Sequence, residues 1–555
     1  MFENRLAREN ANSLSTAIKG SPIEGCPASK RTKLGTSQSR GTGDRVDLYP
    51  VDGSFSFSLS LGFGMQSTHS TLVDWHASEL RLLNLPRELL EEISLWLPAD
   101  QTVQPMLANS LLHSVFSRRL WETYGLATQK KSSRISESAW LRYGHLVRRA
   151  DISSSYCVET VLGHICEVVR LTVELGYLPI VLDSNHHGNQ LRMMQHVTVI
   201  HRNNTLLDVK YAKVVKEWID HAAQRDQRVT FEWMLPVIGD DQFRLLCEMA
   251  DILDDASIHR FTVYVQNCQS PGQFATSTFA AMTKQLTASS GESSYDLLSN
   301  MSSSYTRLSW LELTLDSSVP SDECERIVSI KPDNFPSLQQ LTVSYLLDNT
   351  ATIAQRLFSQ PLHTVTGFVI AWCEDSSVLE HCIQRLPSVV KLRLLACKFP
   401  VNIRAIATHL PRIHSLAFDG EDYTLTDVSW SSNTEFPLLT ELSFAKHALA
   451  MPPAKPEYLT LALLCAPRLL SLRLVGYYVA AHDVELFKRR ASSSVKLLNI
   501  ERYRRRLQME QIDSIVTLFP RANRLTLQHA SKANKQAIQA KYPHLVVIPS
   551  QLQPI

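Results

Sequence analysis

The sequence predicts an α/β protein in which a small N-terminal domain of three helices precedes an irregular solenoid with a parallel sheet on its concave face. Two observations indicate this fold class. A short apolar pattern recurs along the C-terminal half at intervals of about 24 to 30 residues, and the residues between its copies have helical spacing. A compact apolar helix pattern also interrupts an otherwise polar N-terminal region.

Length and composition fit a soluble protein with a large core. The chain has 555 residues, of which 44% are hydrophobic and 20% charged, and its formal net charge is +2. This balance gives no reason to expect nucleic acid or a membrane surface as a partner. The N-terminus lacks the apolar segment of a secretory signal, and no apolar run is long enough to span a membrane. We therefore expect the protein in the cytoplasm, the nucleus or both.

Residues 1–75 are rich in Ser, Gly and Thr and show no helical periodicity, so we expect a disordered tail. The basic cluster "SKRTKLGTSQSR" from Ser29 is compatible with a nuclear address or with an ordinary polar tail. Ten cysteines occur without a C-x-x-C pair, which favours free thiols in a reducing compartment over a disulfide framework.

A helical domain is predicted over residues 80–126. The stretch "LNLPRELLEEISLWL" from Leu83 places a proline in the first turn of a helix and gives that helix a wide apolar face. We expect a second helix over about 102–112 and a third over about 114–124. Three helices of this length bury a very small core, so the domain should dock on something larger.

The solenoid is predicted over residues 150–550. In each copy of the pattern a small residue or proline is followed by apolar residues two, five and seven positions later, and the last two alternate with polar residues as in a half-buried strand. Copies begin at residues 306, 336, 363, 387, 411, 437, 467, 493 and 520. Weaker copies begin at 166, 192 and 256, and a less convincing one lies near 228. Stacked helix–strand units share one core and align their strands in a parallel sheet.

The period fails between about residues 269 and 305. This segment includes "TASSGESSYDLLSNMSSSY", which is rich in serine and almost uncharged. We expect a flexible insertion there, serving as a passive loop or as a phosphorylatable one.

The N-terminal motif resembles an F-box. Leu85-Pro86-x-Glu88-Leu89-Leu90-x-x-Ile93 matches the opening of that family's motif, and Leu120-Trp121 matches the leucine–tryptophan pair near its close. The repeats resemble the leucine-rich repeats that follow F-boxes, with Cys373 and Cys397 at the position that favours Asn or Cys. The irregular spacing is similar to that of F-box families in mushroom-forming fungi.

The resemblance implies a substrate receptor of an SCF-type ubiquitin ligase. In that family the box binds a Skp-type adaptor, which joins a cullin scaffold, and the repeats hold a target protein. By position the implied adaptor-binding residues are Leu85, Pro86, Leu89, Leu90, Ile93 and Trp121. The alternative for this apolar surface is that it packs on the first repeats.

The concave sheet face is the predicted target-binding surface. Side chains four and six positions after each repeat start point away from the core. The residues that we assign to target binding on this basis are Trp310, Gln340, Thr342, Lys391, Arg393, Ser443, Arg473 and Arg524, and the same register exposes Glu312, Glu441, Ser471 and Thr526. Their basic members suggest a partly basic surface for an acidic or phosphorylated segment; the alternative is an ordinary solvated face.

The sequence contains no constellation that indicates an enzyme, a cofactor or a metal. A phosphate-binding loop, a nucleophile elbow and an H-E-x-x-H motif are all absent. His186 and His187 beside Asp183 favour an exposed loop over a zinc site, because no second pair of ligands accompanies them. The basic run "ERYRRRLQ" from Glu501 favours a solvated edge over RNA binding. Two functions remain, a ligase substrate receptor and a non-catalytic repeat scaffold whose degenerate box binds no adaptor.

Overall fold

The computed structural model describes most of the chain from residue 85 onward. The described residues are 85–96, 110–124, 137–152, 164–182, 193–201, 206–289, 293–294, 296–297, 305–315, 329–345, 350–420, 422–428, 436–446, 453–487, 494–501, 509–527 and 532–549. The predicted tail, the histidine pair at 186–187 and most of the run "ERYRRRLQ" lie outside them.

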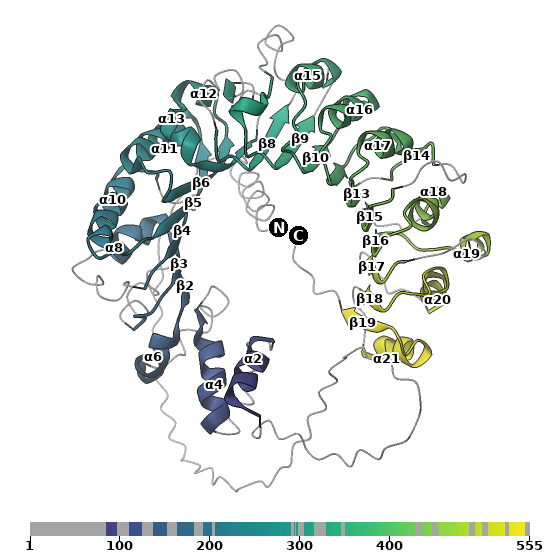
Figure 1. The fold of residues 1–555 in the computed structure, drawn as a ribbon, viewed down its shortest axis with the longest axis horizontal. Coiled ribbons are helices and arrows are strands. Elements are labelled where there is room, and N and C mark those ends of the chain that lie inside the picture. The colour runs from purple at the N-terminus through teal and green to yellow at the C-terminus, as the bar shows by residue number, and fades with distance from the viewer. Residues whose placement is uncertain are drawn as a thin grey trace, which may run out of the picture.

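A curved parallel sheet of 17 strands forms the inner wall of an open ring, and the helices form its outer layer (Figure 1). All the strand pairs are parallel, and the strands follow one another across the sheet in chain order. The strands are β1 (Thr123–Tyr124), β2 (Arg149–Ile152), β3 (Arg170–Glu174), β4 (His196–Ile200), β5 (Thr230–Ile238), β6 (His259–Gln266), β7 (Thr283–Ala288), β8 (Trp310–Leu315), β9 (Gln340–Tyr345), β10 (Gly367–Ala371), β11 (Lys391–Leu395), β13 (Ser415–Gly420), β15 (Glu441–Lys446), β16 (Ser471–Val475), β17 (Leu497–Glu501), β18 (Arg524–Leu527) and β19 (Val546–Pro549).

One helix or helical turn lies between most successive strands and covers the convex side (Figure 1). These helices are α6 (Glu137–Tyr143), α8 (Leu178–Leu182), α10 (Lys210–Ala223), α11 (Asp240–Leu253), α12 (Pro271–Phe274), α13 (Ser277–Met282), α15 (Thr350–Leu357), α16 (Ser376–Arg385), α17 (Ile403–His409), α18 (Pro456–Thr460), α19 (Ala481–Phe487), α20 (Met509–Leu518) and α21 (Lys532–Lys541). A two-stranded sheet joins β12 (Val401–Asn402) to β14 (Leu425–Thr426).

The core lies between the sheet and the outer helices. In β11, for example, Leu392 and Leu394 are buried while Lys391 and Arg393 between and beside them are exposed. The same alternation in the other strands produces one continuous apolar cluster from Trp140 to Val547. The predicted solenoid with a parallel sheet on its concave face is therefore confirmed.

The predicted insertion at 269–305 is wrong over its first half. Residues 271–288 form α12, α13 and β7, and β7 pairs with both β6 and β8 as an ordinary repeat strand. The pattern was hidden because Thr283 occupies an apolar position. Its side chain is fully buried, and its hydroxyl donates a hydrogen bond to the Phe279 carbonyl at 2.7 Å, which satisfies the polar group inside the core.

Strand β5 is a complete repeat strand of nine residues, although its sequence pattern is the least regular. Its first half pairs with β4, beginning at His196 and Thr230, whereas its longer pairing with β6 extends to Ile238. The first concave residue of β4, His196, aligns with Thr230, whereas the first concave residue of β6, Arg260, aligns with Glu232. Because these two positions of β5 lie two residues apart, a single repeat pattern cannot be in register with both neighbouring strands.

The N-terminal helical pair consists of α2 (Arg87–Trp96) and α4 (Ser110–Trp121). The predicted break between a second and third helix near residue 113 is wrong, since α4 runs through it and ends before Thr123, where β1 begins. The sequence has no Pro or Gly there to interrupt a helix. Residues 97–109 lie outside the described part of the chain, and the domain limits 80–126 stay a prediction.

Candidate functional site

The helical pair has a core of its own, separate from that of the solenoid. Leu90, Leu112, Val115 and Phe116 are buried together, with Leu85 and Ile93 packed partly buried against them. The side chain of Leu90 therefore faces inward and contacts this core. The prediction that Leu90 contacts the adaptor directly is therefore corrected, because a fully buried side chain has no surface to offer a partner.

The outer face of α2 remains open among the described residues. Leu89 is 46% exposed and Pro86 is exposed, while Leu85 and Ile93 are partly buried. An exposed leucine beside two half-buried apolar side chains is a surface that a partner can cover. These four residues, Leu85, Pro86, Leu89 and Ile93, are called the α2 face below; adaptor binding by them stays a prediction.

Trp121 lies at the junction between α4 and the solenoid. Its ring stacks on Tyr143 with centroids 5.3 Å apart, and it meets Trp140 edge-on at the same distance. His113 Nε2 and the Tyr143 hydroxyl are hydrogen-bonded at 3.1 Å, and β1 continues the helix directly into the sheet by pairing with β2. Trp121 packs against the solenoid core, so the structure assigns its ring to internal packing rather than to the α2 face.

The concave face carries the side chains that the repeat register predicts. Gln340 aligns with Trp310 on one neighbouring strand, and Thr342 aligns with Glu312, while Lys391 and Arg393 align with Ser415 and Ala417. Lys391, Arg393 and Arg524 are exposed, and the partly buried remainder are Trp310, Gln340, Thr342, Ser443 and Arg473. All eight lie on strands of the concave face (Figure 1). Target binding by them stays a prediction.

The predicted basic surface in the C-terminal half is weakened by an internal ion pair. The Arg393 guanidinium on β11 donates to the Asp419 carboxylate on β13, which is the neighbouring strand in the sheet. This pairing neutralises one of the four basic residues in the predicted target-binding set, which are Lys391, Arg393, Arg473 and Arg524. A different feature of the predicted face is Trp310, whose buried indole N–H has no hydrogen-bond partner among the described residues.

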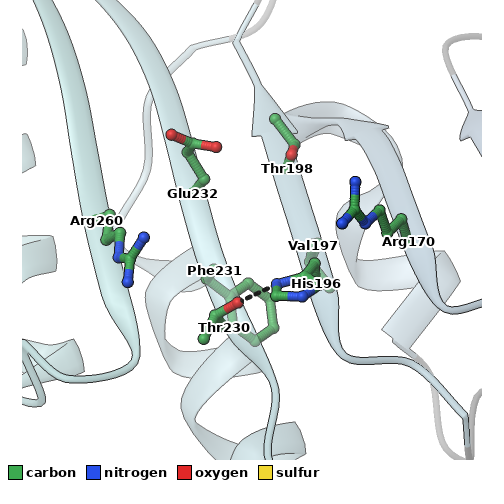
Figure 2. A pocket seen from close by; sticks show the side chains of 8 residues that line it. All are labelled: Arg170, His196, Val197, Thr198, Thr230, Phe231, Glu232 and Arg260. Carbon is green, nitrogen blue, oxygen red and sulfur yellow. Dashed lines mark hydrogen bonds between the residues drawn. The ribbon is translucent and has the colours of Figure 1, made fainter.

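A pocket of about 210 Å³ lies in the N-terminal half of the concave face, across β3, β4, β5 and β6. Figure 2 shows the Arg170 and Arg260 guanidinium groups turned from opposite sides toward His196 and Thr230. The His196 ring and the Thr230 hydroxyl are hydrogen-bonded, with 2.6 Å between Nδ1 and Oγ1. The remaining lining residues are Val197, Thr198, Phe231 and Glu232. The pocket is smaller than a typical small-molecule site, but it has room for a side chain.

Sequence reasoning missed this pocket although a signal for it was present. Arg170, His196 and Arg260 each stand four positions after the start of a weaker repeat copy, which is the first concave position. The register that selected residues in the C-terminal half therefore also selects them, once the weaker copies are counted as full repeats.

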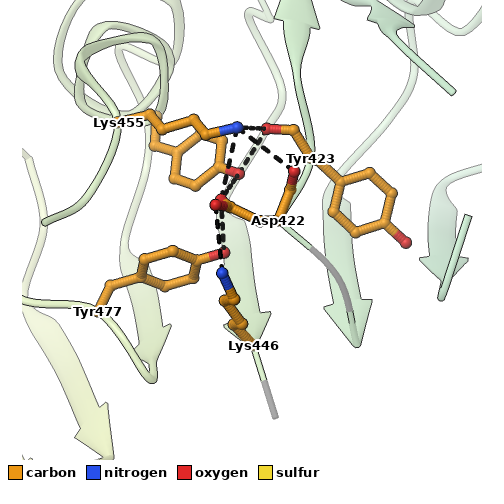
Figure 3. Close-up of polar contacts among 6 residues, drawn as sticks. Asp422, Tyr423, Lys446, Lys455 and Tyr477 are labelled. Atoms are coloured by element: carbon orange, nitrogen blue, oxygen red, sulfur yellow. Dashed lines mark hydrogen bonds and ion pairs between the residues drawn. The ribbon is translucent and has the colours of Figure 1, made fainter. Parts of the chain in front are cut away.

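A second polar cluster surrounds Asp422 (Figure 3). Lys446 Nζ and the hydroxyls of Tyr458 and Tyr477 donate to its carboxylate at 3.2, 3.3 and 3.4 Å, and Lys455 Nζ lies 3.5 Å away. Partial burial opposes ionisation, but hydrogen bonds and charge from the two lysines outweigh it and lower the pKa of the carboxyl. The cluster ties the loop before β14 to β15, α18 and β16, so it stabilises neighbouring repeats.

Three buried thiols are not poised for chemistry. Burial raises the pKa of Cys247, Cys268 and Cys373 to about 12, so these side chains stay protonated at neutral pH. No group of three His, Cys, Asp or Glu residues in the described ranges could hold a metal ion. Within the same ranges no helix is long and apolar enough to cross a membrane.

Comparison with known proteins gives no family assignment. No family model matches the chain, and no curated protein matches it. Among solved structures, it is similar to a chain in the crystal structure of the Rad7 and Elc1 complex in yeast. That likeness has 14% sequence identity and a TM-score of 0.32, and it covers 83% of this chain and 96% of the other. At this TM-score the likeness supports no statement about function.

Proposed function

We propose that this protein is the substrate-recognition subunit of an SCF-type ubiquitin ligase. In this role the α2 face binds a Skp-type adaptor, which joins a cullin scaffold, and the concave sheet face holds a target protein. The chain performs no catalysis itself. It raises the effective concentration of target lysines near the charged ubiquitin carrier, in the cytoplasm or the nucleus.

The observation that carries the proposal is the exposure of Leu89 on a helix that has a separate core. If the helical pair were simply the first layer of the solenoid, α2 would turn its apolar residues toward the repeats. Instead α4 supplies the contact to the solenoid through Trp121, and α2 keeps Leu89 and Pro86 at the surface. The F-box-like motif in the sequence supports the same assignment, since Leu85-Pro86 and Leu89 are among its matching positions.

The competing proposal is a repeat scaffold whose degenerate box binds no adaptor. The burial of Leu90 in the internal core favours this alternative, because this burial removes one apolar side chain from the surface. The two proposals differ only in what covers the α2 face, so adaptor capture separates them.

The test is a pull-down of the tagged full-length chain from cells that contain a Skp-type adaptor, followed by immunoblotting for the adaptor. The intact protein should capture the adaptor, and Pro86→Ala/Leu89→Ala should lose it, because both side chains are at the surface and their loss removes contact area without opening the core. The matched control is Leu486→Ala, which truncates a 51% exposed leucine on α19.

Capture of the adaptor by the intact chain and by Leu486→Ala, with loss in the double variant, supports the receptor. Absence of the adaptor from the intact chain would instead leave the scaffold as the function.

A further inference from the structure

The pocket across β3 to β6 contains positive charge that the described residues do not neutralise. The side chains of Arg170 and Arg260 form no hydrogen bond or ion pair with any described residue. Arg148, one residue before β2, differs in this respect, since its guanidinium forms an ion pair with the Glu167 carboxylate and also donates to the Glu167 carbonyl. The two pocket arginines are therefore available to a ligand.

A third arginine increases the charge at one end of this pocket. Arg149 on β2 aligns directly with Arg170 on β3, and both are exposed. Like charges at directly opposed positions of neighbouring strands repel one another and destabilise a sheet. Neither guanidinium has an acidic partner in the described part of the chain, so a bound anion would relieve this repulsion.

The one carboxylate that lines the pocket is already paired. Lys284 Nζ donates to Glu232 at 3.3 Å, which leaves the two pocket guanidinium groups uncompensated. Two further carboxylates, Asp151 on β2 and Glu174 on β3, lie on the same face but do not line the pocket. The excess of positive charge is thus local to the pocket.

Neutral donors and acceptors complete the site. The Thr230 hydroxyl can donate to the Gln195 carbonyl, 3.3 Å away, while its oxygen accepts from His196 Nδ1. In that arrangement Nε2 of the ring is an acceptor; in the other tautomer the Thr230 hydroxyl donates to Nδ1 and Nε2–H is a neutral donor. Figure 2 shows this histidine between the two arginines.

We propose that this pocket binds a carboxylate side chain of an acidic segment in the target polypeptide. The inference rests on the proposed function, for which it names the kind of target. Guanidinium groups recognise carboxylates through paired charge-assisted hydrogen bonds, and the pocket has room for one side chain. A carboxylate has two acceptor oxygens, one for each of the two guanidinium groups, and on this ground the inference commits to a carboxylate and not to a phosphoryl group.

The test measures fluorescence anisotropy of a short labelled peptide of alternating Glu and Gly with the purified full-length protein. In an extended peptide alternate side chains face the same side, so this probe offers successive carboxylates to the sheet. Two related probes replace each Glu by Gln or by phosphoserine. The Glu peptide should bind more tightly than either, and its binding should weaken as salt is added.

Arg170→Gln/Arg260→Gln should weaken binding of the Glu peptide about tenfold to a hundredfold, the effect of losing one or two hydrogen bonds to charged groups. The matched control is Arg412→Gln/Arg521→Gln, which removes the same charge from exposed turn positions before β13 and β18. It should bind the Glu peptide as the unaltered protein does.

Three outcomes would overturn the inference: binding of the Gln peptide as tight as that of the Glu peptide, equal weakening by both double variants, or tighter binding of the phosphoserine peptide. Adaptor capture is measured on the same variants. Since Arg170 and Arg260 lie on the sheet and not on α2, their replacement should leave capture unchanged. Failure of this inference is thereby separated from failure of the proposed function.

Discussion

At the scale of single residues, the N-terminal repeats contain a buried histidine next in sequence to the pocket residue Arg260. His259 on β6 is 1% exposed, and Trp233 Nε1–H donates to its Nδ1 at 3.3 Å. Burial lowers its pKa from 6.5 to about 4, although Asp255 and Asp254 oppose the shift. The ring is therefore neutral at pH 7, and the acceptor that it offers to Trp233 exists only in that state.

We predict that His259 makes the stability of the protein depend on pH between about 6.5 and 4. A histidine with a lower pKa in the folded chain contributes fully above its unfolded pKa, and that contribution is lost as the pH falls toward the folded value. Between about pH 7.5 and about pH 5.5 the free energy of unfolding should fall by about 1.4 kcal/mol from this residue alone. Urea unfolding at the two pH values measures the change.

The comparison variant is His259→Gln, because glutamine keeps an acceptor for Trp233 Nε1 and does not titrate. Its unfolding free energy should change less between the two pH values than that of the unaltered protein. An identical change in both proteins would show that other groups are responsible.

At the scale of elements, the decisive feature is how α4 joins the solenoid. The helix ends at Trp121, whose ring lies against Tyr143 and Trp140 of α6, and the chain then enters β1. The motif residues that implied an adaptor contact for Trp121 end at Trp121 itself. Its partners come about 20 residues later, so the sequence pattern of the motif could not reveal that the ring is used internally.

We predict that Trp121→Ala loosens the junction and destabilises α4 and α6 together. Replacement of a buried or partly buried tryptophan removes two aromatic contacts and costs about 3 kcal/mol or more where the site cannot collapse. Hydrogen exchange followed by mass spectrometry should report faster exchange in residues 110–121 and 137–152, with β11 and β13 unchanged. Loss of adaptor capture without any change in exchange would instead place Trp121 on the adaptor surface.

At the scale of the whole molecule, the repeat register was readable from the sequence wherever two leucine-like residues flank one polar residue. Leu392-Arg393-Leu394 is such a strand, and its neighbours follow the same rule. The register was hidden at β7, where Thr283 is buried with its hydroxyl satisfied, and at β19, where Pro549 stands in an apolar position at the end of the sheet. Burial of a polar group depends on a hydrogen-bond partner that the pattern does not contain.

The candidate site was predictable to the same limited extent. The repeat register placed Lys391 and Arg393 on the concave face. The carboxylate that neutralises Arg393 belongs to Asp419 of the next repeat, which aligns with Leu395 and not with Arg393. Two guanidinium groups without a partner among the described residues instead lie on β3 and β6, in the copies whose patterns were weak. Charge pairing across strands is a property of the assembled solenoid.

In the proposed function, one protein holds an adaptor through the α2 face while its concave face stays free for a target. The most direct measurement is size-exclusion chromatography with light scattering on the full chain mixed with a purified Skp-type adaptor and the adaptor-binding part of a cullin. We expect a complex with one copy of each protein, and loss of that complex in Pro86→Ala/Leu89→Ala. Elution of the unaltered chain apart from the adaptor, at concentrations above about 10 μM, would contradict it, since weaker association provides less than about 7 kcal/mol of binding free energy.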